Sequence, residues 1–330
     1  FDYDRENYTP DLWVAEGITS YVDDLAVLRA GFAENVKSYL SGRAKAFRDQ
    51  ADLPGGRRTS LAQSSHDAWI KFYRPDENSR NSTVSYYSKG ALVALMLDLR
   101  IRRLSEGGAT LADALRLGWS RFTERGVGFP PGGVEALASE TAGHDLAEFF
   151  DAYVTGTDVL DPNPDLAWVG LRLDVVPSKS DRELPEDEEG FKLAPSLRIT
   201  SSDSGGLCKV ETVYEDGPAF AAGILHDDLI LAVDDLRVSN STLSSRLDKL
   251  ADAETVTVTL FRGQALRTVE LAPAMRRLAD WKLVSVDEPT EAQLEAFEAW
   301  TGWPHPKAPA DTDAADEDAT PEATDAVEED

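Results

Sequence analysis

The sequence predicts a multidomain α + β protein, and three observations support this expectation. Residues 1–158 carry apolar side chains at helical spacing, whereas residues 166–275 hold short runs rich in Val, Ile, Leu and Thr. A Pro- and Asp-rich stretch from Asp158 to Asp165 separates the two parts. Residues 307–330 hold ten acids against one lysine. We therefore expect a mainly helical domain over 1–158, a β domain over 166–275, a strand and helix extension over 276–306 and a disordered acidic tail over 307–330.

Composition excludes several classes of partner. A chain of 330 residues with 42% hydrophobic residues is long enough for two domains with proper cores. The net charge of −27 argues against nucleic acid and anionic membranes as partners. No run approaches the roughly 18 apolar residues that span a bilayer. Cys208 is the single cysteine, which excludes an internal disulfide. The compartment stays open, with the cytoplasm favoured over the periplasm.

The first predicted helix runs from Asp11 to about Leu28. Thr9 can cap it, and Pro10 suits its start because proline has no N–H to leave unpaired there. Winding the segment at about 100° per residue puts Val14, Ile18, Tyr21, Val22 and Leu25 on one apolar stripe. Glu16 falls opposite, beside Leu12, Trp13 and Ser20. A Trp and a Leu are unusual on a solvated face, so we expect this face to line a cleft.

Further helices follow in the first part of the chain. An apolar run from Gly90 to Leu99, interrupted only by Asp98, predicts a helix through the centre of the domain. The other helical patterns cover about 33–49, 111–123, 134–141 and 145–154.

The second part alternates strands with two short helices. The strand patterns are Leu171–Val176, Leu207–Val213, Leu229–Val233, Thr255–Phe261 and Ala265–Leu271. The short helices are Gly217–Gly223 and Ser241–Leu250, and an acidic insertion occupies Ser178–Gly206. A strand at Trp281–Val286 and a helix at about Thr290–Trp300 form the extension.

Two blocks resemble a known enzyme family. The block Leu12–Tyr21, L-W-V-A-E-G-I-T-S-Y, resembles the zinc-ligand helix of gluzincin metallopeptidases, and Val84–Leu92 resembles their Tyr-x-Lys-Gly-Ala segment. With the segments at 1–9 and 67–78, they resemble the glycyl aminopeptidase-like gluzincins of family M61, which end in a PDZ domain. The resemblance covers roughly residues 1–275 and implies a gluzincin-type catalytic subdomain followed by a PDZ-like domain.

The resemblance implies roles for particular residues. Catalytic zinc takes three protein ligands and one open position, and Glu16 matches the family's third ligand. Tyr87 matches the residue whose hydroxyl donates to the oxygen of the tetrahedral intermediate. Tyr86 competes for this role, because neighbours on a helix point about 100° apart and only one of the two can face the zinc.

The PDZ resemblance rests on Gly217–Gly223, which reads G-P-A-x-x-A-G, and on the following strand that ends in Val-Asp-Asp. Val169, Gly170 and Leu171 would then form the loop that binds the terminal carboxylate of a peptide added as a strand. The acidic insertion interrupts this pattern. Either the domain binds a C-terminal peptide, or it is a structural lid that binds none.

One departure from the family is large. Gluzincins bind zinc through an H-E-x-x-H helix, and His66, His144, His226 and His305 are the only histidines, none of them in such a motif. We expect a carboxy-terminal fragment of a longer zinc-dependent aminopeptidase, with peptides as substrates and small residues such as Gly or Ala preferred. Lacking the two zinc histidines and the general base, the fragment should be inactive by itself. The alternative is a non-catalytic adaptor that binds peptides through its PDZ-like domain.

Overall fold

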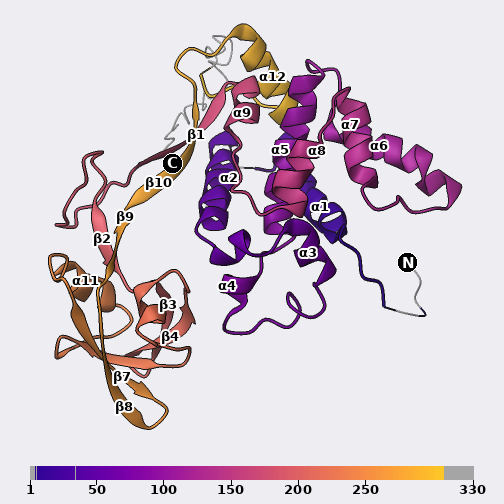
Figure 1. The fold of residues 1–330 in the computed structure, drawn as a ribbon. Helices are drawn as coiled ribbons and strands as arrows, with labels where there is room; N and C mark the ends of the chain where they lie inside the picture. The colour runs from indigo at the N-terminus through magenta and orange to yellow at the C-terminus, as the bar shows by residue number, and fades with distance from the viewer. Residues whose placement is uncertain (1–3, 5, 34, 308–330) are drawn as a thin grey trace, which may run out of the picture.

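The chain folds into a helical body and a β-rich region joined by a narrow ribbon of strands (Figure 1). The structure is a computed structural model that describes residues 4, 6–33 and 35–307. Most of the acidic tail predicted over 307–330 therefore lies outside the described residues. Within them, no helix combines the length and apolar character that crossing a bilayer requires.

The helical body contains most of the chain up to residue 169. Its α-helices are α1 (Leu12–Arg29), α2 (Val36–Ala51), α3 (Leu61–His66), α4 (Ser79–Ser82), α5 (Ser88–Leu104), α6 (Leu111–Arg121), α7 (Gly133–Ala142), α8 (Ala147–Phe150) and α9 (Asn163–Leu166). Shorter turns are η1 (Pro54–Arg57), η2 (Thr123–Arg125), the π-helical turn η3 (Asp151–Thr155) and η4 (Ala167–Val169).

Helix α5 runs through the centre of this body, as its apolar run predicts. The side chains of residues 93–97 expose no surface. Asp98, the one interruption, is also buried and is fully paired. It accepts hydrogen bonds from the Tyr21 hydroxyl at 2.6 Å, the Leu111 amide at 2.8 Å and Arg102 Nε at 3.1 Å. The buried carboxylate thus ties α1 and α6 to the central helix.

The β-rich region is built on an antiparallel sheet with its own core. Its strands lie in the order β3-β4-β5-β7-β8, with β6 beside β5. Their bounds are β3 (Ile199–Ser204), β4 (Leu207–Val213), β5 (Leu229–Val233), β6 (Leu236–Arg237), β7 (Val256–Arg262) and β8 (Ala265–Leu271). The helices α10 (Pro218–Ala221) and α11 (Leu243–Asp248) belong to the same region. Cys208 is fully buried in this core.

Two short ribbons connect this sheet to the helical body. Strand β1 (Leu171–Pro177) pairs with β10 (Ala279–Ser285), and β2 (Leu193–Ser196) pairs with β9 (Ala274–Arg277). The expectation that 171–176 opens the β domain is wrong at this point. Leu171 packs with Leu283 in the core of the helical body, so the first strand belongs to the connecting ribbon.

The chain returns to the helical body after the β-rich region. Helix α12 (Glu291–Thr301) begins with a capping box between Thr290 and Gln293. Its Trp300 is fully buried and donates from Nε1 to the Tyr21 hydroxyl at 3.0 Å. The β-rich region is therefore inserted between two parts of the chain that pack together.

The predicted acidic insertion at 178–206 contains strands β2 and β3, and β3 is an edge strand of the main sheet. The predicted domain limits themselves stay predictions.

Candidate functional site

Glu16 lies half-buried on α1 at the wall of a cleft. The cleft has a volume of about 790 Å³, and its lining includes Leu12, Glu16, Trp69 and Tyr73. Trp13 was expected to share this face, but its side chain is 1% exposed and packs on Phe150. The Trp13 ring therefore lies in the core, and the Glu16 carboxylate lies at the wall of the cleft.

A pair of glycines brings the two sequence blocks together. A Cβ added at Gly17 would lie 2.6 Å from the Gly90 Cα atom, and one added at Gly90 would lie 2.9 Å from the Gly17 Cα atom. These distances are too short for any side chain, so α1 and α5 cross with their backbones in contact. Because Gly17 follows Glu16 and Gly90 lies three residues after Tyr87, the crossing places the two predicted site residues side by side.

Tyr87 stands at the start of α5, close to Tyr73 and Glu16, and both of these side chains interact electrostatically with its phenol. Burial, together with hydrogen bonding to these two side chains and the negative charge of Glu16, raises the pKa of Tyr87 to about 12. The phenol therefore keeps its proton at neutral pH and can act as a hydrogen-bond donor.

Tyr86 has a different environment. Its side chain is fully buried, and its hydroxyl donates to the Tyr73 hydroxyl at 3.4 Å. Burial and this hydrogen bond raise its pKa well above the usual value for tyrosine. Tyr86 is thus a core residue, and Tyr87 is the one of the pair that meets Glu16.

Sequence reasoning missed Tyr73. It contacts both tyrosines and lines the cleft, where its ring stacks on Trp69 with centroids 5.2 Å apart. Trp69 and Tyr73 expose 59% and 53% of their surface, which is high for aromatic side chains. Their segment is irregular, so helical periodicity gave no signal; only its resemblance to the family pointed there.

The described residues do not complete a zinc site. Among them, no three His, Cys, Asp or Glu side chains lie close enough to hold a metal ion together. Glu16 can supply one carboxylate oxygen, and catalytic zinc needs three protein ligands. His66, the nearest histidine in the sequence, contacts Asp67 through Nδ1 at 3.1 Å.

The predicted carboxylate-binding loop lies in the wrong region for that role. Val169 and Leu171 are fully buried in the core of the helical body. Gly170 has a left-handed φ of 67°, and its carbonyl lies 3.2 Å from His305 Nε2. These residues connect η4 to β1 beside α12 and are not part of the main sheet, so the prediction for Val169, Gly170 and Leu171 is corrected.

A better-placed loop precedes the edge strand β3. Leu197 is buried in the core of the β-rich region, and Arg198 adopts a left-handed φ of 59°. Arg198 pairs with Asp216 at 2.8 Å and with Asp52, at the end of α2, at 3.0 Å. The turn before the edge strand is therefore bonded to the helical body.

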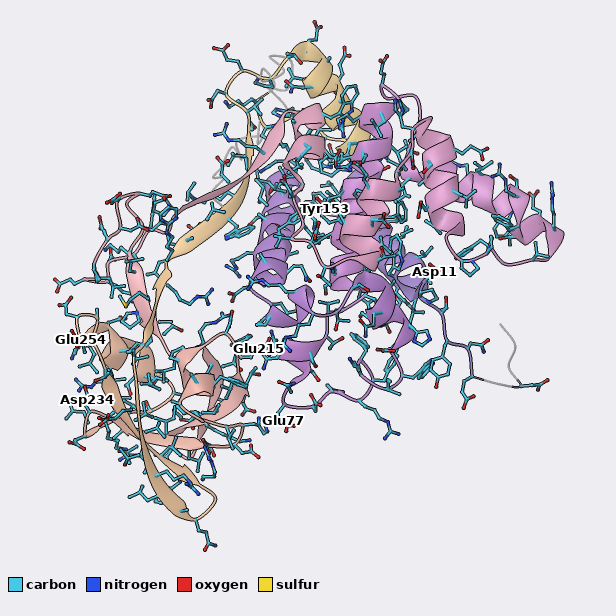
Figure 2. All side chains as sticks on the ribbon, viewed as in Figure 1. Asp11, Glu77, Tyr153, Glu215, Asp234 and Glu254 are labelled. Carbon is cyan, nitrogen blue, oxygen red and sulfur yellow. The ribbon has the colours of Figure 1, made fainter. Side chains whose placement is uncertain are left out.

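Other polar contacts join the two regions near this point. Asn81 donates from Nδ2 to the Val213 carbonyl at 2.8 Å and accepts from the Glu215 amide at 3.1 Å. Glu215, which lies where the β-rich region approaches the helical body (Figure 2), pairs with Arg58 at 2.5 Å. The interface between the regions is thus polar and charged.

Comparisons with known proteins agree with this two-region organisation. Residues 1–93 match the model of the M61 glycyl aminopeptidase family, and residues 195–272 match that of the PDZ domain. The aminopeptidase N family protein from Idiomarina loihiensis aligns over 91% of this chain with 29% identity and a TM-score of 0.77. That alignment covers 50% of the Idiomarina chain, so this chain spans about half the length of that relative.

Two further solved structures align with a smaller share of this chain. The HtrA3 PDZ domain bound to a phage-derived ligand is 18% identical over 33% of this chain and 92% of its own, with a TM-score of 0.20. The serine endoprotease from Yersinia pestis is 28% identical over 26% of this chain and 30% of its own, with a TM-score of 0.21. A search of curated proteins gives no significant match. The chain is therefore similar to the M61 glycyl aminopeptidase family over residues 1–93 and to PDZ domains over residues 195–272.

Proposed function

We propose that this chain contributes to a zinc-dependent aminopeptidase that cleaves peptides near a free amino terminus. The observation that carries the proposal is the contact between Glu16 and Tyr87 at the crossing of α1 and α5, beside an open cleft. In this proposal Glu16 is one of three metal ligands. The other ligands and the general base come from outside residues 1–330.

When bound, zinc would supply the polarised water that such a peptidase needs. The residues of this chain have two tasks of their own. Tyr87, protonated at neutral pH, donates a hydrogen bond to the oxygen on which negative charge develops. Tyr73 and Trp69 form an aromatic wall for the substrate, since both line the cleft and stack on each other.

The PDZ domain has a free sheet edge for a peptide. We propose that β3 receives the added strand and that the turn at Leu197 and Arg198 lies at its end, in place of the loop at 169–171. Main-chain hydrogen bonds along β3 would provide the affinity of such a complex.

Hydrolysis of Gly- and Ala-terminated peptides by the complete gene product tests the enzyme proposal. Replacing Tyr87 by Phe removes one donor to the developing oxyanion, so kcat should fall by roughly 100- to 1,000-fold while zinc content is unchanged. Tyr153→Phe is the matched control, because Tyr153 packs on Phe149 in the same body without touching Glu16. Residues 1–330 alone should show no hydrolysis.

The same experiment distinguishes the peptidase from the alternative function, a non-catalytic adaptor. A complete gene product without zinc and without hydrolysis, whose PDZ domain still binds peptides, would be a non-catalytic adaptor. Tight zinc uptake by residues 1–330 alone would contradict the proposed division of ligands.

A further inference from the structure

A second, larger cavity lies between the helical body and the β-rich region, away from Glu16. We call it the interface cavity; its volume is about 1,000 Å³. The end of α2 and the turn η1 form one wall. Residues 178–182 and the ribbon strands β2, β9 and β10 form the other. The cavity therefore depends on both regions of the molecule.

Its charge is opposite to that of the chain as a whole. Seven cationic and three acidic side chains line it, in a chain with a net charge of −27. The cationic residues are Arg48, Arg57, Arg80, Lys179, Arg182, Arg276 and Arg277, and the acidic residues are Asp49, Asp52 and Asp280. A wall of this kind favours an anionic occupant.

Some of these cations already have partners. Arg182 pairs with Asp248, Arg276 with Asp52, and Arg277 with Asp187 and Glu189. By contrast, no carboxylate of the described part of the chain lies within ion-pair distance of Arg57, Arg80 or Lys179. All three are exposed and line the cavity. Positive charge is thus left over for a ligand.

We propose that the acidic segment 311–330 of this same chain binds in the interface cavity. The segment carries ten carboxylates and no cation, which complements the three unpaired cations. Several neighbouring carboxylates are attracted most strongly to a place where several unpaired cations lie together, and the interface cavity provides such a place.

The length of the chain permits this contact. Lys307 is anchored beside the end of β10, where its Nζ donates to the Val286 and Asp287 carbonyls at 2.8 Å each. Asp280, on the cavity wall, lies six residues before Val286, or roughly 20 Å along the strand. The 23 residues from 308 to 330 span up to roughly 75 Å when extended, which is more than enough.

The test uses a fluorescent peptide with the sequence of residues 308–330, measured by anisotropy at low salt. The receptor is the full chain with the ten acids of its own segment replaced by Asn and Gln, so that the cavity is open. This receptor should bind the peptide. The unmodified chain should bind it at least roughly tenfold more weakly, because its own segment competes at millimolar effective concentration.

Charge variants show where the peptide binds. In the open receptor, the triple change Arg57→Ala, Arg80→Ala and Lys179→Ala should weaken binding by roughly tenfold or more. The matched control is Lys37→Ala, Arg125→Ala and Arg267→Ala, which removes the same charges at exposed sites outside the cavity and should change binding less than twofold.

Cross-linking gives an independent readout without mutation. A carbodiimide joins amines to carboxylates that lie in contact, so it should link Lys179 to residues 311–330 within one chain and leave Lys37 unlinked. Equal peptide binding by the open and unmodified chains would overturn the proposal. The proposal would also be overturned if the open receptor did not bind the peptide, or if the triple change at Arg57, Arg80 and Lys179 did not weaken binding. Cross-links spread evenly over the exposed lysines would overturn it as well.

Discussion

The crossing of α1 and α5 and the interface between the two regions are held together in opposite ways. At the crossing, Gly17 and Gly90 bring two backbones into direct contact, and apolar core residues such as Trp13 pack against them. At the interface, ion pairs such as Arg198 with Asp52 join the two regions beside a cavity of about 1,000 Å³. Close packing fixes the geometry of the crossing, and charge holds an interface that can respond to a ligand or to salt.

The largest loss of stability is expected when Asp98 is replaced, because this residue ties α1 and α6 to α5 in the closely packed helical body. Asp98→Ala leaves Arg102 and the Tyr21 hydroxyl without their buried partner and should lower the free energy of unfolding by roughly 3–5 kcal/mol. Asp49→Ala, which removes a surface carboxylate beside Lys45 and Arg48, should cost about 1 kcal/mol or less. Equal costs in urea unfolding would contradict the assignment of Asp98 as an internal anchor.

Replacing Lys89, which lies beside the crossing, should increase the stability of the protein. Its side chain is 1% exposed, its Nζ has no hydrogen-bond partner, and burial lowers its pKa to about 8, against a weaker opposing effect of Asp158. Lys89→Met removes the cost of burying this charge and should stabilise the protein by roughly 2–3 kcal/mol at pH 7.

The pH dependence of this gain has a definite sign. Between about pH 8 and 10.5 the unfolded chain still holds the Lys89 proton while the folded protein has released it, so wild-type stability rises with pH. The difference between wild type and Lys89→Met should therefore be largest below pH 8 and shrink toward pH 10.5. A difference independent of pH would show that the lysine charge is not the cause.

The third effect comes from the glycine contact itself. Gly17→Ala puts a methyl group against the Gly90 backbone and should cost roughly 1–3 kcal/mol, because the helices must separate. Gly42→Ala in α2 has open space around it and should stabilise by about 0.5–1 kcal/mol, as alanine favours helices. If both substitutions stabilise, the two helices are not in backbone contact.

The smallest effect is expected at the charged interface. Arg198→Ala removes a side chain that is only 7% exposed, but its partners Asp52 and Asp216 are 40% and 38% exposed and can be hydrated again. Global stability should therefore fall by only about 1–2 kcal/mol. Hydrogen exchange should nevertheless speed up at the Glu215 amide, which bonds to Asn81 across the interface, and not in α5. Arg267→Ala, on an exposed strand, is the control. Faster exchange in α5 would mean that the interface supports the packed core directly.

The difference between the packed crossing and the charged interface also explains which features of the structure could be predicted from the sequence. The helices α1 and α5 follow from local periodicity, and Glu16 and Tyr87 from two short blocks whose glycines later prove to touch. The segment Val169–Leu171 was misplaced because a short apolar loop with glycine suits a PDZ groove and a helix junction equally well. Its true environment depends on β10 and α12, more than a hundred residues later, and no local pattern carries that pairing.

Tyr73 and the interface cavity were missed for a related reason. Tyr73 lies in an irregular segment, and its role depends on contacts with Tyr86 and Tyr87. The cations of the interface cavity come from separate stretches between residues 48 and 277 and converge only in the folded chain.

The zinc content of the complete gene product carrying Glu16→Gln decides whether Glu16 is a metal ligand. Glu140→Gln, an exposed carboxylate paired with Arg121, is the control. We expect one zinc per chain in the wild type and the control, and loss of most of this metal in Glu16→Gln with the fold intact by circular dichroism. Full zinc content in Glu16→Gln would contradict the assignment of Glu16 as a metal ligand and remove the basis of the proposed site.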